Sequence, residues 1–370
     1  MSRRAGANAG ADVLIVAEQL RRPLPGGIGT YVGGLLSGLG DLGRDERSGI
    51  SLVASRVKGA DPLLRYGFPV RGIALPAKLV AEAWSKGIGS VGRASLVHAT
   101  SFALPPTTAP LVVTVHDLAF LHHPDAYPPR GLRWHRSALS AALRRAAAFV
   151  VPAVTVKNDL CACGASPEAV HVIEEGADHL PPADDVRTAA LLGRLGVAGP
   201  FLLAVGTREP RKNLERILAA YARLRQAVVD PLPLVVVGPS GWGDDGVSAA
   251  SGVLLAGSVE SEVLAGLYRR ASLLCYAPLE EGFGLPVVEA MQAGTPVVSS
   301  DVPAAGGATQ LVDPFDVESI ATGIHVVLTS DARREGLVSA GRARVRSLTW
   351  RDVARSHLAL WREVTDRGGS

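Results

Sequence analysis

The stretch PLEEGFGLPVVEAMQAGTPVVSS, residues 278–300, places two carboxylates, Glu281 and Glu289, on either side of a glycine-containing turn. The run LLCYA before it, residues 273–277, has the length and apolar character of a buried strand, and residues 286–293 have the pattern of a helix. The stretch therefore predicts a strand, a tight loop and a helix in direct succession.

Two residues mark the ends of this predicted helix. Pro286 suits the first helical position, where its missing N–H costs nothing, and Gly294 suits the left-handed residue that ends a helix. The loop would then point the unpaired N–H groups of Phe283, Gly284 and Leu285 outward at the positive end of the helix dipole. Such a place favours a phosphate or another anion.

Strands and helices alternate in two series along the chain. One series begins with a strand expected at residues 13–17 and ends at a segment rich in proline and charge, residues 180–185. Two series predict an α/β fold of two doubly wound, Rossmann-like domains that face each other across a cleft. We expect a first domain over residues 1–182 and a second over residues 183–349, with a final helix at about 350–370 packing back on the first.

The composition is that of a folded globular protein. Apolar residues make up 47% and charged residues 20% of the 370 residues, which argues against disorder outside the termini; residues 1–11 are expected to be a disordered lead-in. The formal charge is +3, and the sequence pI of about 8.9 comes from arginines spread along the chain. This charge is too diffuse for a nucleic-acid platform but suits anionic ligands.

The cysteines indicate a reducing compartment. Cys161, Cys163 and Cys275 are odd in number and lack a paired CxxC arrangement, which argues against a disulfide framework or a structural zinc site. No stretch approaches the roughly 20 apolar residues of a membrane span, and the first residues lack an apolar signal core. The sequence predicts a cytoplasmic protein whose membrane contact, if any, is peripheral and at the inner face.

A glycine-rich segment follows the first predicted strand and precedes a helix expected at residues 31–42. Gly26 and Gly27 indicate a close backbone approach, either to a ligand or to a neighbouring segment. Val32 stands where the dinucleotide fingerprint requires its third glycine, which argues against a nicotinamide-dependent oxidoreductase.

His116 follows the buried run LVVTV at residues 111–115. In doubly wound sheets ligands gather at the carboxyl ends of strands, so this histidine is well placed for binding, although a structural role is the alternative.

Residues 130–148 have the pattern of a two-faced helix, with leucines on one side and arginines on the other. The basic side is either an ordinary solvated face or a contact for anionic lipid headgroups or a diphosphate-bearing acceptor. Its members are Arg130, Arg133, Arg136 and Arg144.

The motif EEGFGLPVVEAMQAGTPVV resembles the signature of two glutamates separated by seven residues in the retaining glycosyltransferases of family 4, which have the two-domain GT-B fold. Three other segments fall in matching order. PGGIGTY resembles that family's first glycine loop, VVTVHDLAFLHHPDAY its strand ending in an active-site histidine, and VGTREPRKNLERIL its basic loop before a helix. The likeness runs from about residue 12 to residue 366.

The resemblance implies a role for each matching residue. Glu281 would hydrogen-bond hydroxyls of the donor sugar and Glu289 the ribose hydroxyls of the nucleotide, because a carboxylate can accept two hydrogen bonds from a vicinal diol. Lys212 would contact the leaving diphosphate, together with the N–H of Gly27 and the loop amides of residues 283–285. Fixed donors there stabilise the negative charge that develops as the bond breaks.

By the same resemblance, His116 would hydrogen-bond the donor sugar at its 6-hydroxyl, with general-base help as a secondary role. Family members commonly carry an arginine five residues before the lysine, where this chain has Thr207. Arg208 and Arg211 are the available substitutes, and the sequence leaves open which of them faces the diphosphate.

Retention of anomeric configuration is also implied, by front-face attack in which a departing diphosphate oxygen takes the acceptor's proton. The sequence has no Asp-x-Asp element, so we expect no metal, and no cofactor besides the nucleotide sugar as substrate. Loops at residues 240–242, including Trp242, and at residues 258–259 would line the base. The predicted catalytic residues are His116, Glu281 and Lys212, and the predicted donor-binding residues are Gly26, Gly27, Arg208, Arg211, Lys212, Ser258, Val259, Glu281, Phe283, Gly284, Leu285 and Glu289.

Two departures from the family pattern concern the edge of the predicted site. The segment EEGAD places Glu174 and Glu175 where relatives typically have a Pro-Asn-Gly pattern. After Ser300 the chain is about four residues shorter than its relatives, so we expect the rim of the donor pocket to be either open or rebuilt there.

The sequence thus predicts a metal-independent retaining glycosyltransferase that moves a hexose to a glycan or lipid-linked acceptor in cell-surface polysaccharide or glycolipid assembly. Mannose from GDP-mannose is the best single donor, since TREPRKN and EEGFGLP resemble bacterial mannosyl- and rhamnosyltransferases. The alternatives are transfer from dTDP-rhamnose or a UDP-sugar, and a non-catalytic GT-B protein that binds a nucleotide sugar.

Overall fold

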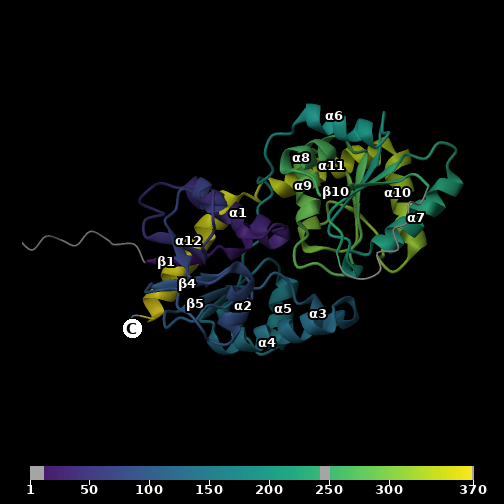
Figure 1. Ribbon diagram of the computed structural model, residues 1–370. Helices are drawn as coiled ribbons and strands as arrows, with labels where there is room; N and C mark the ends of the chain where they lie inside the picture. Colours follow the sequence, from purple (N-terminus) through teal and green to yellow (C-terminus); the bar gives the residue numbers. More distant parts are fainter. Residues whose placement is uncertain (1–11, 242–250, 369–370) are drawn as a thin grey trace, which may run out of the picture. The chain divides into compact units, whose positions relative to one another are not determined.

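The computed structural model describes residues 12–241 and 251–368, so the expectations for residues 1–11 and for Trp242 lie outside the described residues. By their contacts the described residues form two compact units (Figure 1). Unit 1 comprises residues 12–118, 129–179 and 349–368, and unit 2 comprises residues 119–128 and the described part of 180–348.

Unit 1 contains a seven-stranded parallel sheet among the described residues, with the strand order β3-β2-β1-β4-β5-β6-β7. The order reverses between β1 and β4, which is the arrangement of a doubly wound sheet. The strands are β1 Val13–Val16, β2 Ile50–Ser55, β3 Val70–Ile73, β4 Leu96–Ala99, β5 Leu111–Thr114, β6 Ala148–Val151 and β7 Val170–Val172. The helices are η1 Glu18–Arg21, α1 Gly26–Gly40, η2 Pro62–Tyr66, α2 Ala77–Ser85, α4 Pro129–Arg145, α5 Val154–Ala162, η4 Pro167–Ala169 and α12 Trp350–Gly368.

Unit 2 contains a second parallel sheet, with six strands among the described residues in the order β10-β9-β8-β11-β12-β13. Residues 119–128, which we expected in the first domain, group with this unit. The strands are β8 Leu202–Val205, β9 Leu234–Val237, β10 Val253–Gly257, β11 Leu273–Tyr276, β12 Val297–Ser299 and β13 Gln310–Leu311. The helices are α3 Ala119–His122, η3 Pro124–Ala126, α6 Asp185–Arg194, η5 Pro210–Lys212, α7 Leu214–Ala227, α8 Ser261–Arg270, α9 Leu285–Ala293, η6 Pro303–Ala305, α10 Val317–Thr329 and α11 Asp331–Val345.

The apolar runs of the sequence form the core of each unit. Every residue of β1, β5 and β11 is buried, as expected for parallel strands that are covered on both faces. In unit 2, α7 packs beside α10, and α9 packs beside α8 and α11. The two sheets are therefore Rossmann-like, and the α/β fold class predicted from the sequence is confirmed.

Helix α12 closes unit 1 by packing along α1 (Figure 1). Its first residue, Trp350, is buried against three glycines. A Cβ atom at Gly34 would fall 2.1 Å from Cε2 of Trp350, one at Gly38 would fall 2.0 Å from the Trp350 carbonyl oxygen, and one at Gly176 would fall 2.7 Å from the indole ring. Only glycine at these positions lets the start of α12 approach so closely.

A buried polar network also joins α12 to α1 and the sheet of unit 1. The hydroxyl of Tyr31 lies 2.8 Å from Nε2 of His357 and 3.0 Å from Oγ1 of Thr114, and Nε2 of His98 lies 2.8 Å from the same Thr114 oxygen. Burial lowers the pKa of His357 to about 4, although the Val353 carbonyl acts in the opposite direction. His357 is therefore neutral in the folded protein at pH 7.

Helix boundaries differ from the sequence expectation at two places. Helix α1 begins at Gly26, whereas we expected a loop up to residue 30 because glycine has low helix propensity. The packing of Tyr31 and Leu35 in the core outweighs that low propensity. Helix α9 begins at Leu285, so Pro286 is its second residue, and Gly294 ends it with a left-handed φ of 80° as predicted.

The three cysteines are free thiols, with Cys275 buried and Cys161 and Cys163 partly exposed. No helix in the described part of the chain has the length and hydropathy of a membrane span.

Candidate functional site

The basic loop TREPRKN connects β8 to α7 in unit 2 and is held by one asparagine. Asn213 has a left-handed φ of 59°, which asparagine tolerates better than most residues, and it is buried. Its amide Nδ2 donates to the carbonyls of Ala277 (2.9 Å) and Pro314 (2.7 Å). These bonds tie the loop to the end of β11, so Arg211 and Lys212 lie beside the stretch that carries Glu281.

Glu281 is the centre of an ion-pair cluster in unit 2. Its Oε1 atom accepts hydrogen bonds from Nη1 of Arg211 at 2.9 Å and from Nζ of Lys212. Nη2 of Arg211 donates to Oε1 of Glu209 at 2.9 Å, and Nζ of Lys212 also donates to the hydroxyl of Tyr276 at 3.1 Å. The Glu281 side chain is only 10% exposed and that of Lys212 18%, so these charges interact with little screening by water.

The pKa values in this cluster follow from burial and charge. Burial alone raises the pKa of Glu281, but the charges of Arg211 and Lys212 outweigh it and hold the pKa below its ordinary value. Burial, followed by the charge of Glu281, raises the pKa of Tyr276 well above its ordinary value. At neutral pH Glu281 is thus a carboxylate that can accept hydrogen bonds, and Tyr276 keeps its proton.

The two candidate arginines lie in different surroundings. Arg211 contacts Glu281 and Glu209, and it also donates to the backbone carbonyl of Glu280 at 3.0 Å. Arg208 instead donates to Oγ of Ser240, next to an isolated parallel bridge between the same two residues. Of the two, Arg211 belongs to the cluster that contains Lys212.

Glu289 lies in α9 and is buried, near enough to Tyr276 of the Glu281 cluster for its charge to help raise the pKa of that tyrosine. Its Oε2 atom accepts a hydrogen bond of 2.7 Å from the hydroxyl of Tyr268 in α8. Burial and the nearby Glu289 charge raise the pKa of Tyr268 well above its ordinary value, so this hydroxyl remains a donor. Tyr268 therefore fixes the orientation of the carboxylate that we expect to hold ribose hydroxyls.

The loop between Glu281 and α9 presents the start of a helix. Gly284 caps α9 with a φ of 109°, a conformation that favours glycine. Among the described residues, no group accepts a hydrogen bond from the N–H of Phe283, Gly284 or Leu285. Helix η6, in the shortened segment after Ser300, packs against this loop, since the N–H of Ala304 donates to the Phe283 carbonyl at 2.9 Å.

The predicted donor-binding residues of the loop after β10, Ser258 and Val259, lie at the end of that strand in unit 2 and are exposed and half-buried, respectively. In unit 1, Gly26 and Gly27 form the first turn of the 15-residue helix α1 and are exposed. Gly26 has a φ of 61°. Exposed N–H groups at the start of a long helix suit an anion.

His116 lies in unit 1 directly after β5, mostly buried, with both ring nitrogens near acceptors. Nε2 lies 2.9 Å from the carbonyl oxygen of Thr100, and Nδ1 lies 3.5 Å from Oε1 of Glu175. The ring of Tyr31 meets the imidazole edge-on, with centroids 4.8 Å apart. The structure therefore brings Glu175 of the EEGAD segment to the predicted active-site histidine.

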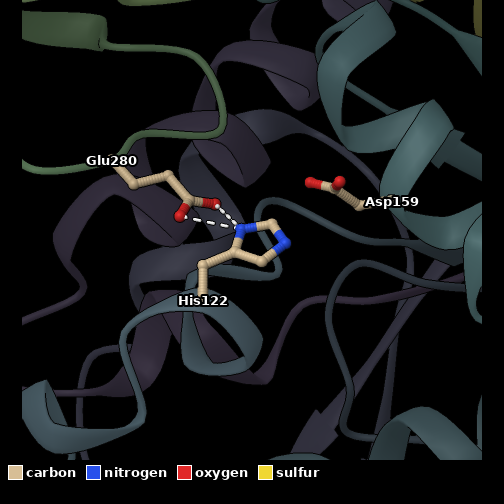
Figure 2. Close-up of side chains that lie close together, drawn as sticks. All are labelled: His122, Asp159 and Glu280. Atoms are coloured by element: carbon tan, nitrogen blue, oxygen red, sulfur yellow. Dashed lines mark hydrogen bonds and ion pairs between the residues drawn. The ribbon is translucent and has the colours of Figure 1, made fainter.

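A second histidine contact involves Glu280, the neighbour of Glu281 in unit 2. Nδ1 of His122, in α3, lies 3.0 and 3.1 Å from the two carboxylate oxygens of Glu280 (Figure 2). Nε2 of His123 lies 3.4 Å from Oε2 of the same carboxylate. These contacts attach residues 119–128 to the loop that carries Glu281. Within either unit, no three described His, Cys, Asp or Glu side chains bring ligand atoms together as a metal site would require.

The basic face predicted between residues 130 and 148 lies on α4 of unit 1. Leu139 and Ala142 are buried on the opposite side of the helix. The four predicted arginines, Arg130, Arg133, Arg136 and Arg144, are all exposed.

Comparison with known proteins identifies the family. The family model for Glycosyltransferase Family 4 matches residues 5–179, and the model for Glycosyl transferases group 1 matches residues 195–344. The chain is a family 4 glycosyltransferase.

Curated relatives of this glycosyltransferase include O-antigen chain mannosyltransferase B of Escherichia coli, which is 29% identical over 69% of this chain and 71% of its own. Phosphatidyl-myo-inositol mannosyltransferase of Mycobacterium tuberculosis is 34% identical over 50% of this chain, and the match spans about half of the relative's length (53%). The match to the MMP alpha-(1->4)-mannosyltransferase of Mycolicibacterium hassiacum also spans about half of the relative (54%).

Solved structures share the fold of this glycosyltransferase. Sucrose-phosphate synthase of Thermosynechococcus elongatus has a TM-score of 0.72 at 19% identity, covering 96% of this chain and 99% of that one. Anabaena HepE in complex with UDP and glucose has a TM-score of 0.70 at 18% identity, covering 95% and 99%. These neighbours support the GT-B fold predicted from the sequence.

Sequence reasoning missed three polar residues that contact the predicted site residues. Tyr276 lies in an apolar run with the pattern of a core strand, and Tyr268 lies in a predicted helix, so the sequence gave no sign of what their hydroxyls contact. Glu209 is visible in TREPRKN, but its pairing with Arg211 depends on the turn of η5.

Proposed function

We propose that this glycosyltransferase transfers mannose from GDP-mannose, with retention of configuration, to a glycan or lipid-linked acceptor of cell-surface polysaccharide or glycolipid assembly. The observation that carries the proposal is the convergence of Arg211 and Lys212 on one oxygen of the buried Glu281. Two cations and one carboxylate, close together and mostly shielded from water, provide charge for a diphosphate and an acceptor for sugar hydroxyls.

In unit 2, the roles divide among neighbouring groups. Lys212 and Arg211 stabilise the leaving diphosphate, and the N–H groups of residues 283–285 contribute further donors at the start of α9. Glu281 accepts from sugar hydroxyls, and Glu289, oriented by Tyr268, accepts from the ribose. In unit 1, Gly27 offers its N–H to the diphosphate and His116 hydrogen-bonds the sugar.

The proposed reaction balances without a protein nucleophile or a metal. The bond between the anomeric carbon and the diphosphate oxygen breaks, and its electron pair leaves with the nucleoside diphosphate. The acceptor oxygen forms the new bond on the same face of the sugar, and its proton passes to a diphosphate oxygen. Metal independence is part of the proposal, because lysine, arginine and backbone donors supply the positive charge.

The choice of mannose is supported by the names of the curated relatives, several of which are mannosyltransferases. dTDP-rhamnose and UDP-sugars remain alternative donors. For the location, we propose the cytoplasm, with the exposed arginines of α4 contacting anionic lipids at the inner face of the membrane.

A donor screen tests the proposal. The purified chain is incubated with GDP-mannose, UDP-glucose, UDP-N-acetylglucosamine, GDP-fucose and dTDP-rhamnose, with and without EDTA, and release of nucleoside diphosphate is followed. We expect turnover of GDP-mannose that EDTA does not abolish. Turnover of another donor alone would correct the sugar, whereas no turnover and no nucleotide binding would refute the proposal.

A non-catalytic nucleotide-sugar-binding protein is the second candidate, favoured by Thr207 and by the short segment after Ser300. Wild type, Glu281→Ala and the matched control Glu280→Ala separate the two. An enzyme loses turnover in Glu281→Ala and keeps most of it in Glu280→Ala. A binding protein shows calorimetric binding of GDP-mannose but no turnover in any of the three.

A further inference from the structure

Glu175 is a buried carboxylate in the segment that follows β7, and none of the roles above uses it. Glu175 is only 4% exposed, although burying an isolated carboxylate costs free energy. Among the described residues, its only recorded ion-pair partner is Nδ1 of His116, at 3.5 Å. Glu174, the preceding residue, is exposed. The charge that departs from the family's Pro-Asn-Gly pattern is therefore placed against the predicted active-site histidine.

The two nitrogens of His116 both face groups that accept hydrogen bonds. The Thr100 carbonyl can only accept, so Nε2, at 2.9 Å from it, carries a hydrogen. Nδ1 faces the Glu175 carboxylate, which also only accepts when ionised. A neutral imidazole has one N–H and would leave one of these contacts unsatisfied, whereas the imidazolium ion satisfies both.

The surroundings of His116 include several other polar groups. Burial alone lowers the pKa of His116, but Glu175, the Thr100 carbonyl and the charge of Asp117 together raise it above its ordinary value. Tyr31, whose own pKa burial raises above its ordinary range, packs edge-on against the ring and is neutral, and His98 is buried with a lowered pKa and is also neutral. No other charged group of unit 1 is recorded against this ring among the described residues.

We infer that Glu175 is a positioning residue that holds His116 as a fixed, doubly protonated imidazolium. The inference rests on the proposed function only for its catalytic meaning. A histidine with both nitrogens protonated cannot take the acceptor's proton. It therefore acts towards the substrate as a positive charge and not as a general base, and any hydrogen bond to the sugar comes from an N–H that is shared with Thr100 or Glu175.

The first test needs no substrate. The protonation of His116 is followed by NMR of the protein with ¹⁵N-labelled histidine, and the signal is assigned by its loss in His116→Gln. We expect Glu175→Gln to move the titration midpoint to lower pH by about one pH unit, because an opposing charge is removed. The matched control Glu174→Gln should leave it in place. An unchanged midpoint in Glu175→Gln would refute the pairing.

The second test asks whether the imidazolium is the active form. If it is, kcat of the wild type is constant at lower pH and falls as pH rises through the His116 midpoint. In Glu175→Gln this alkaline limb should move to lower pH by the same amount as the NMR midpoint, with KM for the donor little changed at pH 6. Glu175→Asp keeps a carboxylate, so its alkaline limb should lie between those of the wild type and Glu175→Gln.

The outcomes of the two tests are distinguishable. A moved NMR midpoint with an unmoved kcat limb, or activity that rises as His116 loses its proton, would overturn the inference. If no donor is turned over at all, the proposed function fails while the NMR midpoint still decides whether Glu175 holds the imidazolium. If Glu175→Gln does not fold, Glu175→Asp serves for the same titration. Its shorter side chain places the carboxylate farther from the imidazole ring, so the midpoint should still move to lower pH.

Discussion

The hydroxyl of Tyr268 donates a 2.7 Å hydrogen bond to Oε2 of Glu289, joining α8 to α9 inside unit 2. If Glu289 holds the ribose, Tyr268→Phe should raise KM for the nucleotide sugar by about 2- to 10-fold, the effect of one lost hydrogen bond, with a smaller change in kcat. Steady-state kinetics measures both. Tyr221→Phe, which removes a buried hydroxyl bonded to the carbonyls of Leu232 and Gly252, is the control and should leave KM unchanged.

Arg211 and Arg208 should differ in their importance. Arg211→Ala should lower kcat/KM by about 10- to 100-fold, because it removes a charged hydrogen bond to Glu281, whereas Arg208→Ala should change it less than about threefold. Equal losses in the two variants would contradict the assignment of Arg211 to the diphosphate.

The acid limb of the pH profile of kcat/KM should respond to Arg211→Ala. Arg211 and Lys212 hold the pKa of Glu281 below its ordinary value, so the carboxylate stays ionised as pH falls. Removing Arg211 raises this pKa, and activity that needs the ionised carboxylate is then lost at higher pH on the acid limb. The pH dependence of kcat/KM for wild type and Arg211→Ala checks this. An acid limb at the same pH in both proteins would show that Glu281 ionisation does not limit the reaction.

Asn213 should stabilise unit 2 through both its backbone and its side chain. Asn213→Gly keeps the left-handed φ but loses the bonds to Ala277 and Pro314, so the free energy of unfolding should fall by about 1–3 kcal/mol. Asn213→Ala should cost about 1 kcal/mol more, because alanine is strained in this conformation. Urea unfolding measures both, with exposed Asn158→Ala as the control. Equal losses for glycine and alanine would mean that the left-handed backbone is not what selects asparagine.

The stability of unit 1 should decrease in mild acid. The pKa of His357 is about 4 in the folded protein and ordinary, near 6.5, in the unfolded chain. Between these values the unfolded chain binds more protons, so the free energy of unfolding falls as pH is lowered from about 6.5 to 4, by up to about 3 kcal/mol. In His357→Gln the free energy of unfolding should fall less over this pH range, whereas in the control His325→Gln, at an exposed position, it should fall as much as in the wild type. A fall of the same size in His357→Gln would assign the effect to other groups, such as His98.

Membrane contact through α4 should depend on lipid charge. Wild type should float with vesicles that contain phosphatidylglycerol and not with vesicles of phosphatidylcholine alone, and salt should weaken the binding. Replacement of Arg130, Arg133, Arg136 and Arg144 by glutamine should remove most of this binding, at about 1 kcal/mol per arginine near the surface. Undiminished flotation of the variant would leave the arginines as an ordinary solvated face.

The sequence was informative where local patterns determine the structure. Buried runs such as residues 111–115 become strands, and the left-handed end of α9 at Gly294 follows from glycine alone. The order of four motifs was sufficient for the family and the GT-B fold.

What the sequence could not show are pairings between distant segments. Glu175 and His116 are far apart in the chain, and only the packing of β5 with β6, and of β6 with β7, brings them together. The preference for Arg211 over Arg208 depends on the direction in which η5 turns. We expected the first helix to begin at residue 31, whereas it begins at Gly26. The low helix propensity of glycine argued against an earlier start, and the sequence did not show that burial of Tyr31 and Leu35 would outweigh it.

The packing of Trp350 against Gly34 and Gly38 of α1 has a consequence for the order in which the two units fold during synthesis. Unit 1 is assembled from segments that are synthesised before and after most of unit 2. Until residues 350–368 emerge, the space beside Gly34 and Gly38 stays open, and Tyr31 lacks its His357 partner. Unit 2 can complete its own sheet before residues 350–368 are synthesised, whereas the unit that carries His116 is complete only after they are.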